Sequence, residues 1–221
     1  HTLALTADGT VMGWGKGDFG RLGNGKRKQV VPEPCVLLQD AGVRAVQAVA
    51  GGSFSAVVGD DGSLWTFGRN DQSQLGLGAN LTMDFNSMEE FPVRNTRFGD
   101  AKVLSVACGK QHALAITDDN GVWYWGSRQF IEPHRMTVLD GKDIVQVAAG
   151  DGFSAALSAD GQLYTWGKGY LSGALGHAKS KGEKQPRAVE TFSEISVARV
   201  ACGAKHAAAI LGYAPADVQR F

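Results

Sequence analysis

One pattern of residues occurs four times along this chain of 221 residues. Each copy has an anchoring His or Phe, an apolar stretch, a turn pair such as Asp-Gly, and a second apolar stretch that ends in an aromatic residue followed by glycine. The four copies begin at His1, Phe54, His112 and Phe153. The aromatic residue stands thirteen positions after each anchor, at Trp14, Phe67, Trp125 and Trp166. A fifth copy opens at His206 and loses the pattern after Gly212. A constant core with variable connections indicates a repeated structural unit.

Each copy predicts a β-hairpin whose two strands are covered on both faces. Along the first stretch every position is apolar or small, which is typical of a strand buried on both sides. The second stretch also has apolar residues on both faces, so we expect the hairpins to stack sheet on sheet. The pairs between the stretches accept positive φ in a two-residue hairpin turn. They are Asp8-Gly9, Asp61-Gly62, Asn120-Gly121 and Asp160-Gly161.

Two further strands flank each hairpin. A short apolar segment with a glycine end precedes each anchor from the second copy onward: RAVQAVAGG, KVLSVACGK, DIVQVAAGD and ARVACGA. A segment with proline follows each hairpin, and proline is tolerated in an edge strand because it need not donate to the ladder. These prolines are Pro32, Pro34, Pro92, Pro133 and Pro186. Four strands in a unit of about 50 residues is the size of a propeller blade.

The repeat resembles that of the regulator of chromosome condensation family. The resemblance lies in VACGKQHALAITDDNGVWYWG (residues 106–126), in GRLGNG (20–25) and in SQLGLG (73–78), and the pattern covers nearly the whole chain. It implies a β-propeller, which in this family usually closes at seven blades. We therefore expect an all-β protein: a partial or open arc of four-stranded blades, with about four blades and the start of a fifth.

The whole of residues 1–221 is then one propeller segment. Its approximate repeats are 1–48, 49–105, 106–146, 147–199 and an incomplete 200–221. An open arc leaves unpaired sheet ends, which invite pairing with other chains. We expect further blades or a partner chain to cover them.

Composition limits the classes of partner. The chain has 22 basic and 22 acidic residues, and this balance argues against nucleic acid or an anionic membrane as the main partner. No apolar run is long enough to predict a membrane span. Three cysteines without a disulfide framework indicate a reducing, intracellular compartment, and the sequence does not distinguish nucleus, cytoplasm and organelle.

The residues that look most reactive are predicted to be packing residues. Three anchors are histidines where two others are phenylalanines, and a metal ligand or catalytic base cannot be exchanged for phenylalanine among equivalent positions. Cys108 and Cys202 likewise align with Ala50 and Ala149, which indicates a small side chain in the core. The aspartates of the turn pairs are explained as turn formers. We therefore predict no catalytic residue, no metal site and no cofactor, and a protein that is not an enzyme.

The default function is a scaffold for protein–protein interaction, which binds partners through loops on one face of the propeller. The turns before the anchors repeat in geometry and differ in chemistry. They are therefore the candidate binding surface, with the residues Ser53, Lys110, Gln111, Asp151 and Lys205.

The family resemblance implies two other functions. The first is guanine-nucleotide exchange on a Ran-type small GTPase, for which the family's exchange factor uses acidic residues in the turns before the anchors and a wedge hairpin. Only Asp151 matches those acidic residues, and the connection SRQFIEPHR after Gly126 is too short for a wedge. The second is tryptophan-based ultraviolet photoreception. It needs Trp and Arg before the anchors, where this chain has neither, and Trp65 and Trp123 are expected in the blade core.

Overall fold

The computed structural model describes residues 1–26, 29–38, 42–78, 87–168, 173–178 and 182–212. These residues form antiparallel sheets, which we call blades 1 to 5 in chain order. Blade 1 contains β1 (Thr2–Leu5), β2 (Val11–Lys16) and β3 (Val30–Leu37). Blade 2 contains β4 (Ala45–Ala50), β5 (Phe54–Gly59), β6 (Leu64–Arg69) and β7 (Met88–Asn95). Blade 3 contains β8 (Val103–Cys108), β9 (His112–Thr117), β10 (Val122–Gly126) and β11 (Phe130–Arg135).

Blade 4 contains β12 (Ile144–Ala149), β13 (Phe153–Ser158), β14 (Leu163–Gly167) and β15 (Glu183–Ala188). Blade 5 contains β16 (Val197–Cys202) and β17 (Ala207–Leu211). The described helices are single 3-10 turns: η1 (Asp18–Gly20), η2 (Thr137–Leu139) and η4 (Glu190–Phe192). No helix in these described stretches has the length and apolar character needed to cross a membrane.

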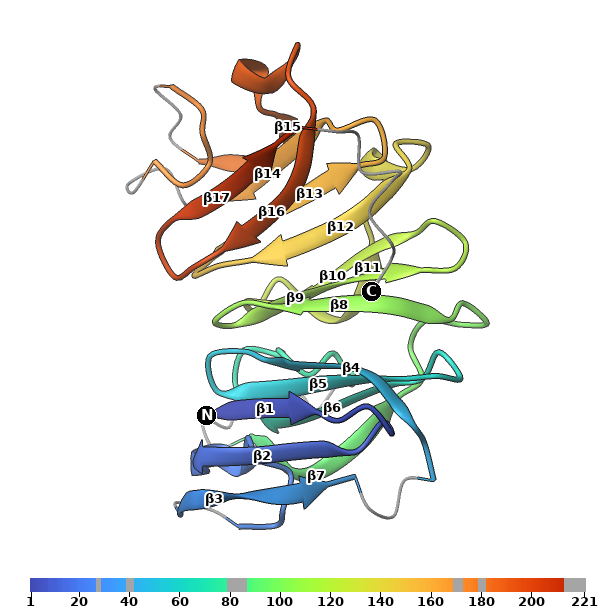
Figure 1. Cartoon of the computed structure of the whole chain (residues 1–221), viewed down its shortest axis with the longest axis vertical. Coiled ribbons are helices and arrows are strands. Elements are labelled where there is room, and N and C mark those ends of the chain that lie inside the picture. The colour runs from blue at the N-terminus through green and yellow to red at the C-terminus, as the bar shows by residue number, and fades with distance from the viewer. Residues whose placement is uncertain (27–28, 39–41, 79–86, 169–172, 179–181, 213–221) are drawn as a thin grey trace.

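The blades follow one another in chain order as an open arc, as Figure 1 shows. The inner strands of successive blades pack face to face: β1 against β4, β4 and β5 against β8, β8 and β9 against β12, and β12 and β13 against β16. The prediction of an open arc with four blades and the start of a fifth is confirmed. The hydrogen-bonded sheets of blades 2 to 5 begin at Ala45, Val103, Ile144 and Val197, a few residues before the repeat starts estimated from the sequence.

Strand order within the blades agrees with the sequence pattern. In blades 2, 3 and 4 the glycine-ended strand lies on one side of the hairpin and the proline strand forms the opposite edge. Anchors face the glycine of the aromatic-glycine pair, as in Phe54 opposite Gly68 and Phe153 opposite Gly167. The prolines therefore lie in strands that need no ladder partner on their outer side.

The hairpin turns are longer than predicted. In blade 2, Gly59 N donates to Ser63 O (2.8 Å) and Gly62 N donates to Gly59 O (3.0 Å), which leaves a three-residue loop with Gly62 at φ +81°. The prediction of two-residue turns was wrong. The geometry is a type I turn followed by a residue with positive φ, and this residue need not be the glycine of the pair. In blade 3 it is Asn120, at φ +58°.

The core consists of clusters between successive blades rather than one centre. Between blades 2 and 3, Trp125 and Phe54 are fully buried together with Leu75, and the Phe98 ring meets the Trp125 ring edge-on at 5.8 Å. Cys108 packs against the same cluster. Each blade therefore depends on the next to cover its face, as expected for a repeat architecture.

Candidate protein-binding surface

The loops before the anchors follow one another from blade 2 to blade 5 and are joined by backbone hydrogen bonds. We call residues 51–53, 109–111, 150–152 and 203–205 the anchor-end surface. Across successive blades, Gly52 N donates to Gly109 O (3.0 Å), Lys110 N donates to Gly150 O (3.1 Å) and Asp151 N donates to Ala204 O (3.1 Å). The loops therefore form a continuous rim whose backbone positions are fixed.

Glycine at the first position of these loops is required by the spacing of the blades. A Cβ on Gly109 would lie 2.5 Å from Gly150 O and 2.6 Å from the ring of His112, and a Cβ on Gly150 would lie 2.7 Å from Gly203 O. These distances are too short for any side chain. The glycine end of each upstream strand is therefore an inter-blade contact, and variation in chemistry is confined to the two residues that follow.

The five predicted residues lie on this rim, and the structure pairs two of them directly. Lys110 Nζ lies 2.7 Å from Asp151 Oδ2, with 58% of the Lys110 side chain and 32% of the Asp151 side chain exposed. Gln111 and Lys205 are exposed, and Ser53 is partly exposed. A surface ion pair of this kind contributes at most about 1 kcal/mol. Lys110 and Asp151 can therefore exchange their mutual contact for contacts with a partner at low cost.

A cationic and aromatic group beside Ser53 was not predicted. The Arg69 guanidinium lies over the Phe19 ring at 4.5 Å, and Arg69 also pairs with Asp71 at 2.8 Å. Arg21 is buried, and its side chain donates to Asp18 O (2.7 Å) and Gly52 O (3.3 Å). Burial lowers the pKa of the Arg21 guanidinium, although nearby Asp18 opposes that shift. The family motif GRLGNG contains Arg21, but nothing in the sequence indicated that it contacts the Ser53 loop.

The anchoring histidines bond across blades. His112 is 1% exposed, and its Nε2 lies 2.9 Å from Ser154 Oγ of blade 4. His1 Nε2 lies at the same distance from Ser55 Oγ of blade 2. Burial lowers the pKa of His112 to about 4, so this ring is neutral near pH 7. Both rings therefore take part in inter-blade packing, and each adds one polar contact to it.

The turn aspartates and the cysteines have structural environments. Hydrogen bonds within each turn hold the pKa of Asp8, Asp61, Asp119 and Asp160 below the ordinary value, led by a hydroxyl donor from Thr6, Ser63, Thr117 and Ser158 respectively. Burial raises the pKa of Cys202 to about 12 and that of Cys108 further, so both thiols stay protonated. Within the described stretches, no group of three His, Cys, Asp or Glu is arranged to hold a metal ion.

Comparison with family models identifies the repeat. The model described as "Regulator of chromosome condensation (RCC1) repeat" matches residues 8–58, 61–116 and 160–210, and a second model of that repeat matches 103–130 and 144–171. The chain belongs to the regulator of chromosome condensation repeat family. This RCC1 assignment confirms the resemblance inferred from the sequence, and the propeller-type sheets agree with it.

Among curated RCC1 relatives, human "E3 ubiquitin-protein ligase HERC2" is 35% identical over 229 residues, which cover 95% of this chain and 4% of that protein. "Ultraviolet-B receptor UVR8" of Arabidopsis thaliana is 31% identical over 223 residues, covering 95% of this chain and 49% of the receptor. The match to HERC2 is thus a small part of a much larger protein, and the match to UVR8 is about half of its length.

Solved structures show the same fold. Human WBSCR16 superposes with a TM-score of 0.82 at 25% identity, covering 96% of this chain and 55% of the other. Prp20p of Saccharomyces cerevisiae, described with its binding properties to Gsp1p and histones, superposes with a TM-score of 0.78 at 19% identity, covering 94% and 52%. At that identity the likeness to Prp20p establishes the fold alone.

Proposed function

We propose that this RCC1-repeat chain is a non-enzymatic scaffold that binds a protein partner through the anchor-end surface. The observation that carries the proposal is the chain of backbone hydrogen bonds from Gly52 to Ala204. It fixes the backbone of the rim while the side chains at the following positions differ from blade to blade. A rigid backbone with varied side chains gives specificity without a large cost in loop ordering.

The chemistry of the rim favours a partner with polar and acidic groups around an apolar or aromatic patch. Lys110, Gln111 and Lys205 offer donors, Asp151 offers one acceptor, and the Phe19–Arg69 pair adds an aromatic face with a cation over it. Arginine and aromatic residues are common among the side chains that dominate protein interfaces.

Site-specific photo-crosslinking tests the proposal. A benzophenone amino acid is placed at Gln111 or at Lys205, and in a matched control at Asp118, which is exposed in the hairpin turn at the opposite end of blade 3. The expected result is one set of crosslinked proteins from both rim positions and its absence from Asp118. Capture of the same proteins from Asp118 would contradict a rim-specific function.

Guanine-nucleotide exchange on a Ran-type GTPase is the second candidate, and Gsp1p binding by Prp20p supports testing it. The described connection after β10 contains only residues 127–129 before β11, which leaves no room there for a wedge hairpin. The assay is release of a fluorescent nucleotide from a Ran-type GTPase, with an Asp151→Ala variant as the comparison. A release rate that does not change when the protein is added ends this candidate.

Photoreception is the third candidate, and the similarity to UVR8 is its support. The ring nitrogens of Trp65 and Trp123 donate to hydroxyls of their own hairpins, Ser63 Oγ (3.0 Å) and Thr117 Oγ1 (2.9 Å), which explains both residues structurally. An ultraviolet-induced change in oligomeric mass would favour this candidate over a scaffold.

A further inference from the structure

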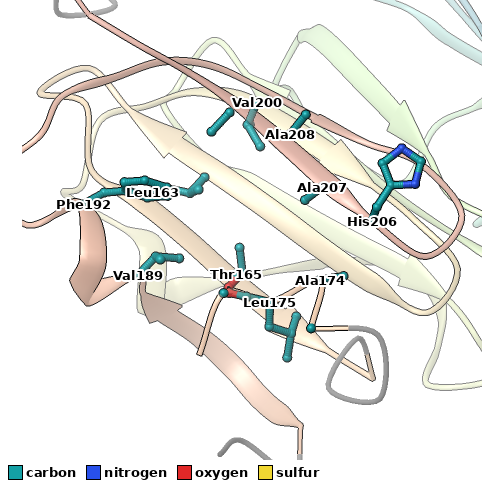
Figure 2. A pocket seen from close by; sticks show the side chains of 13 residues that line it. Leu163, Thr165, Ala174, Leu175, Val189, Phe192, Val200, His206, Ala207 and Ala208 are labelled. Carbon is teal, nitrogen blue, oxygen red and sulfur yellow. The ribbon is translucent and has the colours of Figure 1, made fainter. Parts of the chain in front are cut away.

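A cavity of about 290 Å³ lies between the outer half of blade 4 and strand β17 (Figure 2). Its lining is mostly apolar and includes Leu163, Leu175, Val189, Phe192 and Val200. The same strand β17 forms the edge of the two-stranded blade 5 and, in the described part of the chain, has a ladder partner on one side only. An open strand edge and an apolar cavity therefore lie side by side.

The equivalent space between blades 2 and 3 is filled by Trp125 of β10. The Trp125 ring nitrogen donates to Gln74 O (2.9 Å), and the ring lies edge-on to Phe98. The ring also covers Gly76, where a Cβ would come within 2.7 Å of it. In the ladder, Trp125 stands opposite Ala113. The chain thus contains a complete example of how such a space is occupied.

Part of the cavity wall of blade 4 reproduces the wall of blade 2. Thr66 Oγ1 donates to Leu75 O (3.0 Å) and so holds the loop that receives Trp125. In blade 4, Thr165 Oγ1 donates to Leu175 O (2.6 Å) in the same way. The two loops are therefore held to their strands by the same side-chain bond, and Leu75 and Leu175 are both buried.

A glycine follows the buried leucine in both loops, and in blade 2 the Trp125 ring covers this glycine. Gly176 has φ +70° and Gly76 has φ +66°, so the two backbones turn alike. A Cβ on Gly76 would collide with Trp125, whereas a Cβ on Gly176 would meet only Val189, at 3.2 Å. Phe192 of η4 precedes β16 as Phe98 precedes β8, and it lines the cavity. The space over Gly176 therefore has the walls of an aromatic site.

The fifth copy does not carry the aromatic residue at the register of the other copies. Thirteen positions after His206 the sequence has Gln219 in place of the aromatic that every complete copy carries. The residue opposite the missing aromatic is Ala207, which follows its anchor as Ala113 follows His112.

We propose that β17 and this cavity bind an extended segment of a partner protein that contains an aromatic-glycine pair. The segment adds antiparallel to the edge of β17, with its aromatic residue opposite Ala207 and its ring over Gly176. Backbone bonds to the strand edge provide affinity, and the cavity provides specificity for the ring, as in other cases of strand addition. Trp is preferred over Phe because its N–H can reach the carbonyl of Ala174, the equivalent of Gln74. This site is distinct from the anchor-end surface.

Peptide binding tests the site. The probe is the labelled peptide NGVWYWGS, which has the sequence of residues 120–127, and the control has alanine in place of the tryptophan that corresponds to Trp125. Fluorescence anisotropy with the complete chain is expected to show saturable binding below about 1 mM. The alanine peptide is expected to bind at least about tenfold more weakly, because a buried aromatic anchor dominates such contacts. Absence of saturable binding, or equal binding of both peptides, would overturn the proposal.

Matched variants in blade 5 locate the binding. Ala207→Arg introduces a charge into the cavity lining, whereas Ala201→Arg places the same charge on the opposite face of the sheet, since Val200 and Cys202 face blade 4. Both alanines are exposed, so neither variant disturbs a buried position. We expect Ala207→Arg to weaken peptide binding at least about tenfold and Ala201→Arg to leave it within about twofold. Equal losses would refute the assigned site.

Two further measurements distinguish other occupants. Sedimentation velocity of the chain alone would reveal a second copy in the site as self-association that Ala207→Arg abolishes. A chain ending at Gly212 that binds the peptide, while the complete chain does not, would show that residues 213–221 occupy the site. Either result would overturn the proposal that a partner segment occupies the site. Peptide binding by a monomeric chain of residues 1–221 would support the proposal.

Discussion

Acidification is expected to weaken the contact between blades 3 and 4 through His112. The ring is buried between the blades, and burial lowers its pKa to about 4 from the ordinary 6.5 that it regains in the unfolded chain. The folded state therefore resists protonation of a group that the unfolded state protonates readily. The stability associated with neutral His112 is complete above about pH 6.5 and is lost as the pH falls toward about 4.

The size of the effect follows from the pKa difference. About 2.5 pKa units at 1.36 kcal/mol each amount to roughly 3 kcal/mol over the whole window. Between pH 7 and pH 5 the loss is about 2 kcal/mol. The turn aspartates have pKa values below the ordinary 3.8 and therefore titrate at lower pH.

The chain itself offers the control. His112 faces Ser154, which is the residue directly after the anchor of the next blade. The equivalent residue is Ala113 in the blade after Phe54 and Ala207 in the blade after Phe153. A His112→Phe, Ser154→Ala double variant therefore replaces one natural pair with the other and removes the titrating group.

Urea unfolding followed by tryptophan fluorescence at pH 7 and pH 5 measures the difference. Wild type is expected to lose about 2 kcal/mol of unfolding free energy, and the double variant is expected to lose much less. A His134→Gln variant, changed at an exposed histidine of β11, should behave as wild type. A double variant with the full pH dependence of wild type would refute this explanation.

Three other outcomes follow from the inter-blade contacts. Gly109→Ala should destabilise the fold by about 1–3 kcal/mol in a denaturant titration, because the added Cβ would lie 2.5 Å from Gly150 O. A loss of stability below about 0.5 kcal/mol would contradict that clash. Replacing both Lys110 and Asp151 with alanine should change the unfolding free energy by no more than about 1 kcal/mol at low salt, and by less at high salt. A larger loss would mean that this ion pair is needed for the stability of the fold. Burial raises the pKa of the partly buried Cys108 thiol, so this thiol should resist iodoacetamide in the native protein and react in urea. Rapid labelling of the native protein would contradict this expectation.

The strands were predictable because each carries a local signal that repeats. Four aligned copies show which positions are always apolar, and proline identifies the outer strand in each blade, so Pro92 and Pro133 were assigned to edges correctly. The turn type was not predictable from the dipeptide. In blade 3 the residue with positive φ is Asn120, one position before the glycine that aligns in the pattern.

Contacts between blades needed the structure. Phe19 adopts φ +62°, and this local conformation places its ring under Arg69, fifty residues away in the sequence. No periodicity in the sequence encodes such a contact. The register alone placed Lys110 and Asp151 in equivalent loops of successive copies, but the ion pair between their side chains needed the structure.

The anchors and the residues that follow them show how packing and chemistry are combined at the blade interfaces. A buried imidazole needs a hydrogen-bond partner and a buried phenyl ring does not, because an unpaired polar group in the core costs about 1–3 kcal/mol. The chain provides a partner for one ring nitrogen of each histidine: His1 Nε2 meets Ser55 and His112 Nε2 meets Ser154, while alanine follows the anchor in the blade after each phenylalanine. Alignment of single copies treats histidine and phenylalanine as interchangeable packing residues, which is correct for volume. Only the pair across the interface explains the choice between them, so any blade that covers the exposed His206 should present serine or threonine to its ring.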